Sequence, residues 1–179
     1  GRGVVVEAVG PGGGAALDVR RLREELGRGG VRLVALTWAC NVTGDILPVR
    51  EIIEAARGAG ALVLVDGAQM AGWAEVDLIE MGVDLFAAAG HKGFQAPWGI
   101  GILYARRGVL FETPGAVCEL PAPGQPRACG AMPGYCDVGS VDRAALAGLC
   151  AGLDWIQARP QRLAEARARV EVLAAALER

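Results

Sequence analysis

Two apolar runs in this 179-residue chain each end on polar side chains that could do chemistry. The run 61–65 ends on residues 66–69, and the run 85–89 is followed by Gly90, His91 and Lys92. Of the 18 Lys and Arg residues, 17 are Arg, and the single Lys directly follows the single His. Lysine, unlike arginine, can lose its proton and attack a carbonyl as a free amine. Lys92 is therefore the candidate nucleophile; the alternative is one lysine left by chance in an Arg-biased composition.

Three polar residues each follow an apolar stretch that is typical of a buried strand. Asn41 follows the run 33–38, Asp66 follows the run 61–65, and Lys92 follows the run 85–89. Helical patterns lie between these runs, and strands that alternate with helices form a parallel sheet. In such sheets ligands bind outside the carboxyl ends of the strands. The sequence therefore predicts one site at that edge, with one polar side chain from each strand.

The whole pattern predicts an α/β fold with a mainly parallel sheet and helices on both faces. Residues 1–159 are expected to form its core, and 160–179 a helix that leads away from it. Residues 108–134, rich in Pro and Gly, are expected to form a long loop. The expected strands are 4–9, 33–38, 61–66, 85–90 and 100–104, and the expected helices are 18–27, 48–58, 78–81, 142–159 and 161–179.

Helix ends and faces follow from individual residues. Asp18 and Asp142 are expected to cap helix N-termini, and Pro48 is expected in a first turn. Helices 18–27 and 48–58 are each expected to have one apolar face. In the last helix an apolar side is expected to face inward, formed by Leu163, Val170, Leu173 and Leu177.

Bulk composition excludes several classes of protein. Hydrophobic residues make up 53% of the chain and the net charge is −2, so no basic surface for nucleic acid is expected. No apolar run is long enough to span a membrane. The odd number of cysteines predicts a reducing, cytoplasmic setting, and their spacing fits no metal site. They are Cys40, Cys118, Cys129, Cys136 and Cys150.

Three segments resemble one enzyme family. They are Asp66-Gly67-Ala68-Gln69, Gly90-His91-Lys92 and Pro97-Trp98-Gly99-Ile100-Gly101. Together they are similar to the pyridoxal-phosphate (PLP) enzymes of aminotransferase class V, and within that class to the cysteine desulfurase and selenocysteine lyase group. The likeness runs from about Val4 to the end and covers only the middle of such an enzyme. It implies the large-domain portion of PLP fold type I, with helix 160–179 leading toward a small C-terminal domain.

The resemblance assigns roles to two residues. It implies that Lys92 holds PLP as a Schiff base and that Asp66 pairs with the pyridine nitrogen. A protonated nitrogen makes the cofactor an electron sink. Unit charges about 4 Å apart at an effective dielectric of about 20 interact by about 4 kcal/mol, which is enough to hold that proton. The alternative for Asp66 is a simple turn residue after a strand.

Four more residues are implied as cofactor-binding. Gln69 and Asn41 match positions on the ring side of the cofactor, and His91 matches a phosphate contact. For Gln69 and Asn41 the alternative is a turn residue that bonds its own backbone. Ser140 lies in a segment similar to one that reaches the phosphate in the neighbouring subunit, which implies a homodimer.

Some positions depart from the family pattern. Ala89 stands where Ser or Thr is usual, and loss of a charge-assisted bond to phosphate costs about 1.5–3 kcal/mol. Two function classes follow. The first is a PLP-dependent enzyme acting on an amino acid, of which this chain is an incomplete fragment that is expected to be inactive alone. The second is a non-catalytic relic or interaction subunit with weakened cofactor binding. Desulfuration, transamination and elimination stay open. Three cysteines on or beside the long loop are predicted to be dispensable for sulfur release, namely Cys118, Cys129 and Cys136.

Overall fold

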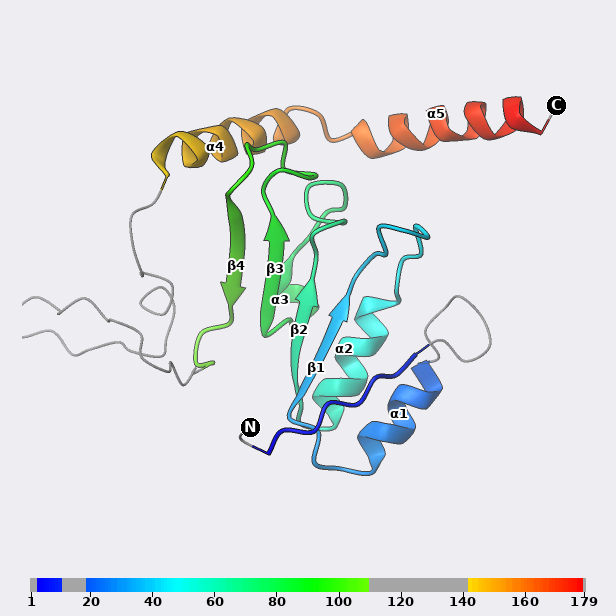
Figure 1. Ribbon diagram of the computed structural model, residues 1–179, viewed down its shortest axis with the longest axis vertical. Coiled ribbons are helices and arrows are strands. Elements are labelled where there is room, and N and C mark those ends of the chain that lie inside the picture. Colours follow the sequence, from blue (N-terminus) through cyan, green and yellow to red (C-terminus); the bar gives the residue numbers. More distant parts are fainter. Residues whose placement is uncertain (1–2, 11–18, 110–141, 179) are drawn as a thin grey trace, which may run out of the picture.

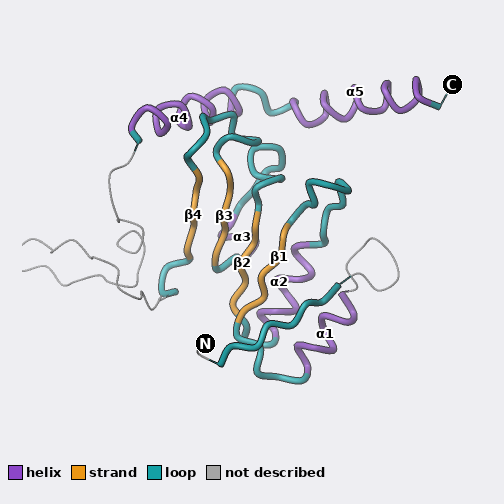
Figure 2. Tube along the Cα trace, viewed as in Figure 1, coloured by secondary structure: helices purple, strands orange, loops and turns teal. Residues whose placement is uncertain are grey.

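The computed structural model of the protein describes residues 3–10, 19–109 and 142–178. These residues form a four-stranded sheet of order β1-β2-β3-β4 and five helices (Figures 1 and 2). Strands β1, β2 and β3 are parallel, and β4 is antiparallel to β3. The elements are α1 (Val19–Gly27), β1 (Leu33–Thr37), α2 (Val49–Gly58), β2 (Leu62–Asp66), α3 (Leu78–Met81), β3 (Leu85–Ala89), β4 (Gly101–Ala105), α4 (Arg143–Gln157) and α5 (Arg162–Leu177).

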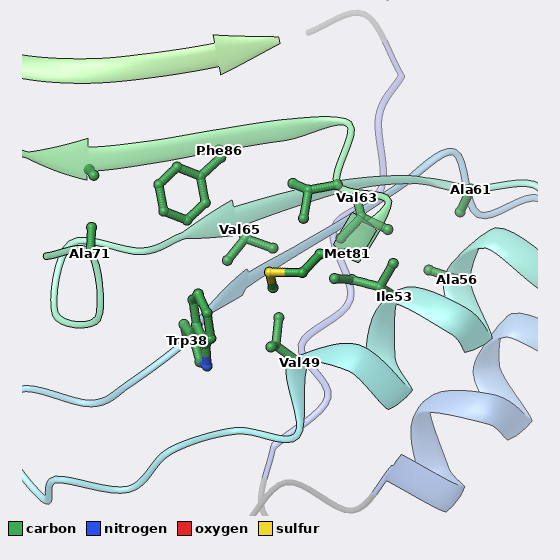
Figure 3. Close-up of a cluster of buried hydrophobic side chains, with 12 residues drawn as sticks. Trp38, Val49, Ile53, Ala56, Ala61, Val63, Val65, Ala71, Met81 and Phe86 are labelled. Atoms are coloured by element: carbon green, nitrogen blue, oxygen red, sulfur yellow. The ribbon is translucent and has the colours of Figure 1, made fainter. Parts of the chain in front are cut away.

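The main core lies between one face of the sheet and helix α2. Val63 and Val65 alternate along β2 toward this face, and both are fully buried. Ile53 of α2 and Met81 of α3 pack against them, and Phe86 of β3 closes the cluster (Figure 3). Because alternate side chains of a strand point to opposite faces, the apolar run of β2 supplies only half of its residues to this core.

Helix α1 is attached to the core through α2. Its buried side chains, Leu22 and Leu26, form a second cluster with Ile52 of α2. The predicted apolar face of this helix is therefore confirmed. Pro48 precedes the first residue of α2, at the helix N-terminus as expected. Asp18 lies outside the described residues, so its predicted capping role stays a prediction.

The opposite face of the sheet is open in the part of the chain that the structure describes. Leu33, Leu62 and Leu103 point to this face and are 47%, 37% and 39% exposed. The α/β fold with a mainly parallel sheet is confirmed. The described helices α1 to α3, however, lie on the core face alone, whereas the sequence predicted helices on both faces.

Two of the expected elements differ from the structure. Residues 4–9 form no strand, and Val4, Val5 and Val6 are 81–90% exposed, because no described strand offers them backbone partners. The last helix is present, but the side of α5 predicted to face inward is largely exposed. Val170, Leu173 and Leu177 are 64%, 59% and 77% exposed, since no described element packs on that side.

Helix α4 lies beyond the carboxyl end of β3 and the neighbouring end of β4, and α5 extends away from it (Figure 1). The Asp142 side chain caps α4 as predicted, accepting hydrogen bonds from the N–H groups of Ala144 and Ala145 at 2.9 and 3.0 Å. Ala145 and Leu149 are buried beneath the helix. The fold therefore places α4 beside the strand ends where the sequence predicts a site. No helix among the described residues is long and apolar enough to cross a membrane.

Candidate cofactor site

Asp66 is the last residue of β2, in the centre of the sheet. It lies between Thr37 of β1 and Ala87 of β3, on the open face. Its side chain is half-buried, and Oδ1 accepts a hydrogen bond from the Ala68 N–H at 2.9 Å. Among the described residues Oδ2 has no hydrogen-bond partner, and it is not sealed off from solvent. One carboxylate oxygen thus holds the turn, while the other remains accessible to a ligand.

Lys92 follows β3, the strand next to β2, and its side chain is half-buried. Its carbonyl accepts bonds from the backbone N–H of Gln95 at 2.9 Å and from that residue's side-chain amide at 3.1 Å. Within the described ranges its amine has no ion pair or hydrogen bond. The turn therefore holds the backbone of Lys92, while its Nζ group has no bond to another described residue.

His91 stacks on an exposed tryptophan. Its ring lies 4.0 Å from the Trp98 ring, centroid to centroid, with 13° between the planes. Trp98 is 81% exposed. The stack fixes the imidazole at the rim of the strand ends, beside Lys92. The predicted contact of His91 with a phosphate stays a prediction.

The turns after β2 and β3 pack backbone against backbone. A Cβ on Gly93 would overlap the carbonyl oxygen of Ala71, and one on Gly72 would overlap the backbone of Gly93. Gly72 also has φ +81°, which side-chain-bearing residues rarely adopt. These two glycines allow the turn after β2, which contains Gln69 (the Gln69 turn), to contact the turn after β3, which contains Lys92 (the Lys92 turn). Gln69 itself is half-buried, and its amide has no hydrogen bond in the described part.

Asn41 lies at the tip of the loop after β1. This loop is closed by backbone bonds from Cys40 N–H to Asp45 O and from Gly44 N–H to Cys40 O, at 2.9 and 3.0 Å. Thr43 donates to Asp45 Oδ2 at 2.6 Å. The Asn41 amide takes no part in these bonds and is exposed, so it does not act as the turn residue of the alternative interpretation. The loop is joined to the centre of the sheet by the bond from Trp38 N–H to Asp66 O, at 2.9 Å.

Cys40, beside Asn41, has a lowered thiol pKa. The causes are the Thr43 hydroxyl first, then the backbone N–H groups of Thr43 and Val42, which stabilise the thiolate. The hydroxyl has one proton, however, and Asp45 already accepts it. We therefore attribute more of the lowering to the two backbone donors than to the hydroxyl.

The strand ends thus bring together Asn41, Asp66, Gln69, His91 and Lys92 at one edge. Ser140 lies outside the described residues, and its predicted role is untested. Within the described ranges no cluster of three His, Cys, Asp or Glu side chains could hold a metal ion.

The sequence profile of aminotransferase class V matches residues 2–179. The chain belongs to the aminotransferase class-V family. A cysteine desulfurase from Yersinia pestis (strain Pestoides F) is 35% identical over 130 residues, which is 70% of this chain and 32% of the relative. This class-V chain therefore spans about a third of the length of such curated relatives.

Two solved structures are similar to this class-V chain. The apo structure of cysteine desulfurase from Thermococcus onnurineus NA1 has a TM-score of 0.68 and 28% identity, covering 86% of this chain and 39% of that one. The cysteine desulfurase CsdA (S-sulfonic acid) from Escherichia coli has a TM-score of 0.57 and 30% identity, covering 70% and 32%. The suspected family and its cysteine desulfurase-like group are thereby confirmed.

Sequence reasoning missed two side chains near this edge. Trp73 lies in the turn after β2 that also contains Gln69, and Arg162 is the first residue of α5. Neither belongs to the segments that carry the resemblance. Only the contact between two parts of the chain 89 positions apart brings them together.

Proposed function

We propose that this class-V chain holds PLP and serves an enzyme that acts on an amino acid by cysteine desulfurase-like chemistry. One observation supports this most. The single lysine and a half-buried carboxylate follow adjacent strands, and both Lys92 Nζ and Asp66 Oδ2 are free of hydrogen bonds within the described residues. An aldehyde and a protonated ring nitrogen are the groups that these two side chains fit.

When bound, PLP supplies an electron sink for the bonds at an amino acid's α-carbon. Lys92 would hold the aldehyde carbon of PLP through its amine, and the same amine, when free, could take and return a proton. Asp66 Oδ2 would accept from the ring N–H, while Oδ1 continues to hold the turn at Ala68.

The remaining residues orient the cofactor. Gln69 and Asn41 have amides without hydrogen bonds in the described residues, so they are available to the ring side. His91 is proposed to reach the phosphate, and Ser140 to reach the phosphate in a second copy, which makes the enzyme a homodimer. A reducing, cytoplasmic setting is proposed from the cysteines.

The relatives support a proposal for the substrate class. The similar proteins are cysteine desulfurases, so L-cysteine is the proposed substrate, with sulfur transfer as the outcome. Ala89 supports a second candidate, the non-catalytic relic. It lies on the open face of β3, three residues before Lys92, and cannot donate to a phosphate.

A comparison of the wild-type protein and Lys92→Ala tests this function. After incubation with PLP and gel filtration, the wild-type protein should absorb visible light and release sulfide from L-cysteine with added reductant. Lys92→Ala should do neither. A protein that stays colourless and releases no sulfide would support the relic, and a coloured protein that releases no sulfide would refute the substrate.

A further inference from the structure

Arg162 joins three separate parts of the fold. Its guanidinium Nη1 donates to the carbonyl of Gly93 at 3.4 Å, next to Lys92. The same group lies 5.1 Å from the centre of the Trp73 ring, a cation–π distance. Trp73 lies in the turn after β2, Gly93 in the turn after β3, and Arg162 at the start of α5.

The two turns that Arg162 contacts are already in close backbone contact. Gly93 lies against the carbonyl of Ala71 and the ring of Trp73. One of these turns begins at Asp66 and contains Gln69, and the other contains Lys92. The relative position of Asp66, Gln69 and Lys92, the side chains proposed to bind the cofactor, therefore depends on how these two turns are held together.

Helix formation does not explain an arginine at this position. A positive charge at a helix N-terminus opposes the helix dipole. Arg162 is nevertheless partly buried, and this burial lowers the pKa of its guanidinium. Its planar group can bond a carbonyl and lie against an aromatic ring at the same time, which a lysine cannot do equally well.

We propose that Arg162 is a positioning residue that fastens the Gln69 turn to the Lys92 turn, and so sets Lys92 relative to Asp66. This inference rests on the proposed function in its last step alone. The start of α5 then becomes part of the support of the site. A displacement of α5 would make local opening of the Lys92 turn easier without any change in the residues proposed to bind PLP.

Hydrogen exchange tests the fastening without PLP. The amides of Gln95 and Ala96 bond within the lysine turn, to the carbonyls of Lys92 and Gly90 at 2.9 Å each. In Arg162→Ala their exchange should be roughly tenfold faster, because local opening becomes easier. Exchange at Val63 and Val65 in the core should stay unchanged.

Arg159→Ala is the matched control. Arg159 makes a similar cation–π contact, 4.4 Å from the centre of the Trp155 ring, but its side chain has no hydrogen bond, ion pair or ring contact with either turn among the described residues. Its removal should leave the amides of Gln95 and Ala96 unchanged. Arg162→Lys, which keeps the charge and loses the planar group, should give an intermediate rate.

A second readout concerns Lys92 itself. The pH midpoint of the visible absorption of the PLP-loaded protein should move in Arg162→Ala and stay fixed in Arg159→Ala. Unchanged exchange at Gln95 and Ala96 in Arg162→Ala, or an equal rise at Val63 and Val65, would overturn the fastening. If the wild-type protein binds no PLP, the proposed function fails, while the exchange result still decides whether Arg162 holds the turns.

Discussion

The two carboxylate oxygens of Asp66 have different environments. Oδ1 holds the Ala68 N–H, and Oδ2 is free of protein hydrogen bonds in the described residues. Asp66→Asn can keep the turn with its amide oxygen but removes the charge. Loss of about 4 kcal/mol of charge pairing predicts a fall in kcat of roughly 10³.

Circular dichroism and PLP occupancy of Asp66→Asn should stay near wild type while turnover falls. Asp66→Ala, which also loses the turn bond, should lower thermal stability as well. Turnover of Asp66→Asn within about twofold of wild type would mean that the carboxylate serves only the turn, since such a change is under roughly 0.5 kcal/mol.

Cys40 gives a pH-dependent prediction. Donors from Thr43 and Val42 lower the pKa of its thiol, and the Asp45 carboxylate opposes them. Thr43→Val removes the hydroxyl that donates to Asp45 and so leaves this carboxylate uncompensated near the thiolate, which should raise the pKa of Cys40 and slow its alkylation at pH 8. Asp45→Asn removes the opposing charge, so the pKa should fall and alkylation should accelerate.

Iodoacetamide labelling with peptide mass mapping separates Cys40 from the other cysteines. Its pH midpoint should shift in opposite directions in the two variants. A shift in the same direction would contradict this account of the thiolate.

At the scale of elements, a buried carboxylate ties the amino ends of β2 and β3 to the end of β4. Asp84, 4% exposed, accepts from Val63 N–H at 2.8 Å and from Arg106 Nε at 2.7 Å. Asp84→Ala leaves the Val63 N–H without a partner in the core. We expect it to lower the free energy of unfolding by about 3 kcal/mol, measured by urea denaturation.

Arg106→Ala is the matched control. The Arg106 side chain is 49% exposed, so solvent screens its pair with Asp84, and its removal should cost only about 1 kcal/mol. Equal losses in the two variants would show that the ion pair, rather than the backbone bond at Val63, holds these strands.

The order of the elements could be predicted because each carries a local signal. Asp142 capped a helix, Leu22 and Leu26 formed an apolar face, and the run 85–89 formed a central strand. Local patterns do not report what packs against a surface. The sequence pattern therefore predicted a strand at the valines 4–6 and an inward-facing apolar side on α5, although both are exposed in the described structure.

The difference between local patterns and contacts over long distances in the sequence also explains which parts of the site could be predicted. Asp66 ends β2 and Lys92 lies in the turn after β3, and parallel topology alone brings such residues to one edge. The role of Arg162 depends on a contact with Gly93, 69 positions away, which no local pattern contains. Asp84 was missed although it is a charged residue inside the apolar stretch 81–89, and that interruption was a usable signal.

At the scale of the whole molecule, the proposed site needs a second copy. Ser140 is proposed to bond the phosphate in the partner, so the active form should be a homodimer. Sedimentation should give a dimer, and Ser140→Ala should weaken PLP binding by roughly 10- to 100-fold through loss of a charge-assisted bond. An active monomer, or unchanged PLP affinity in Ser140→Ala, would contradict the shared site.

The central claim is that Lys92 holds PLP. Borohydride reduction of the PLP-loaded protein converts the C=N link to a stable amine, and peptide mass mapping then locates it. The account predicts a pyridoxyl adduct on the peptide that contains Lys92, and none in Lys92→Ala. A protein that binds PLP but carries no adduct on Lys92 would contradict it.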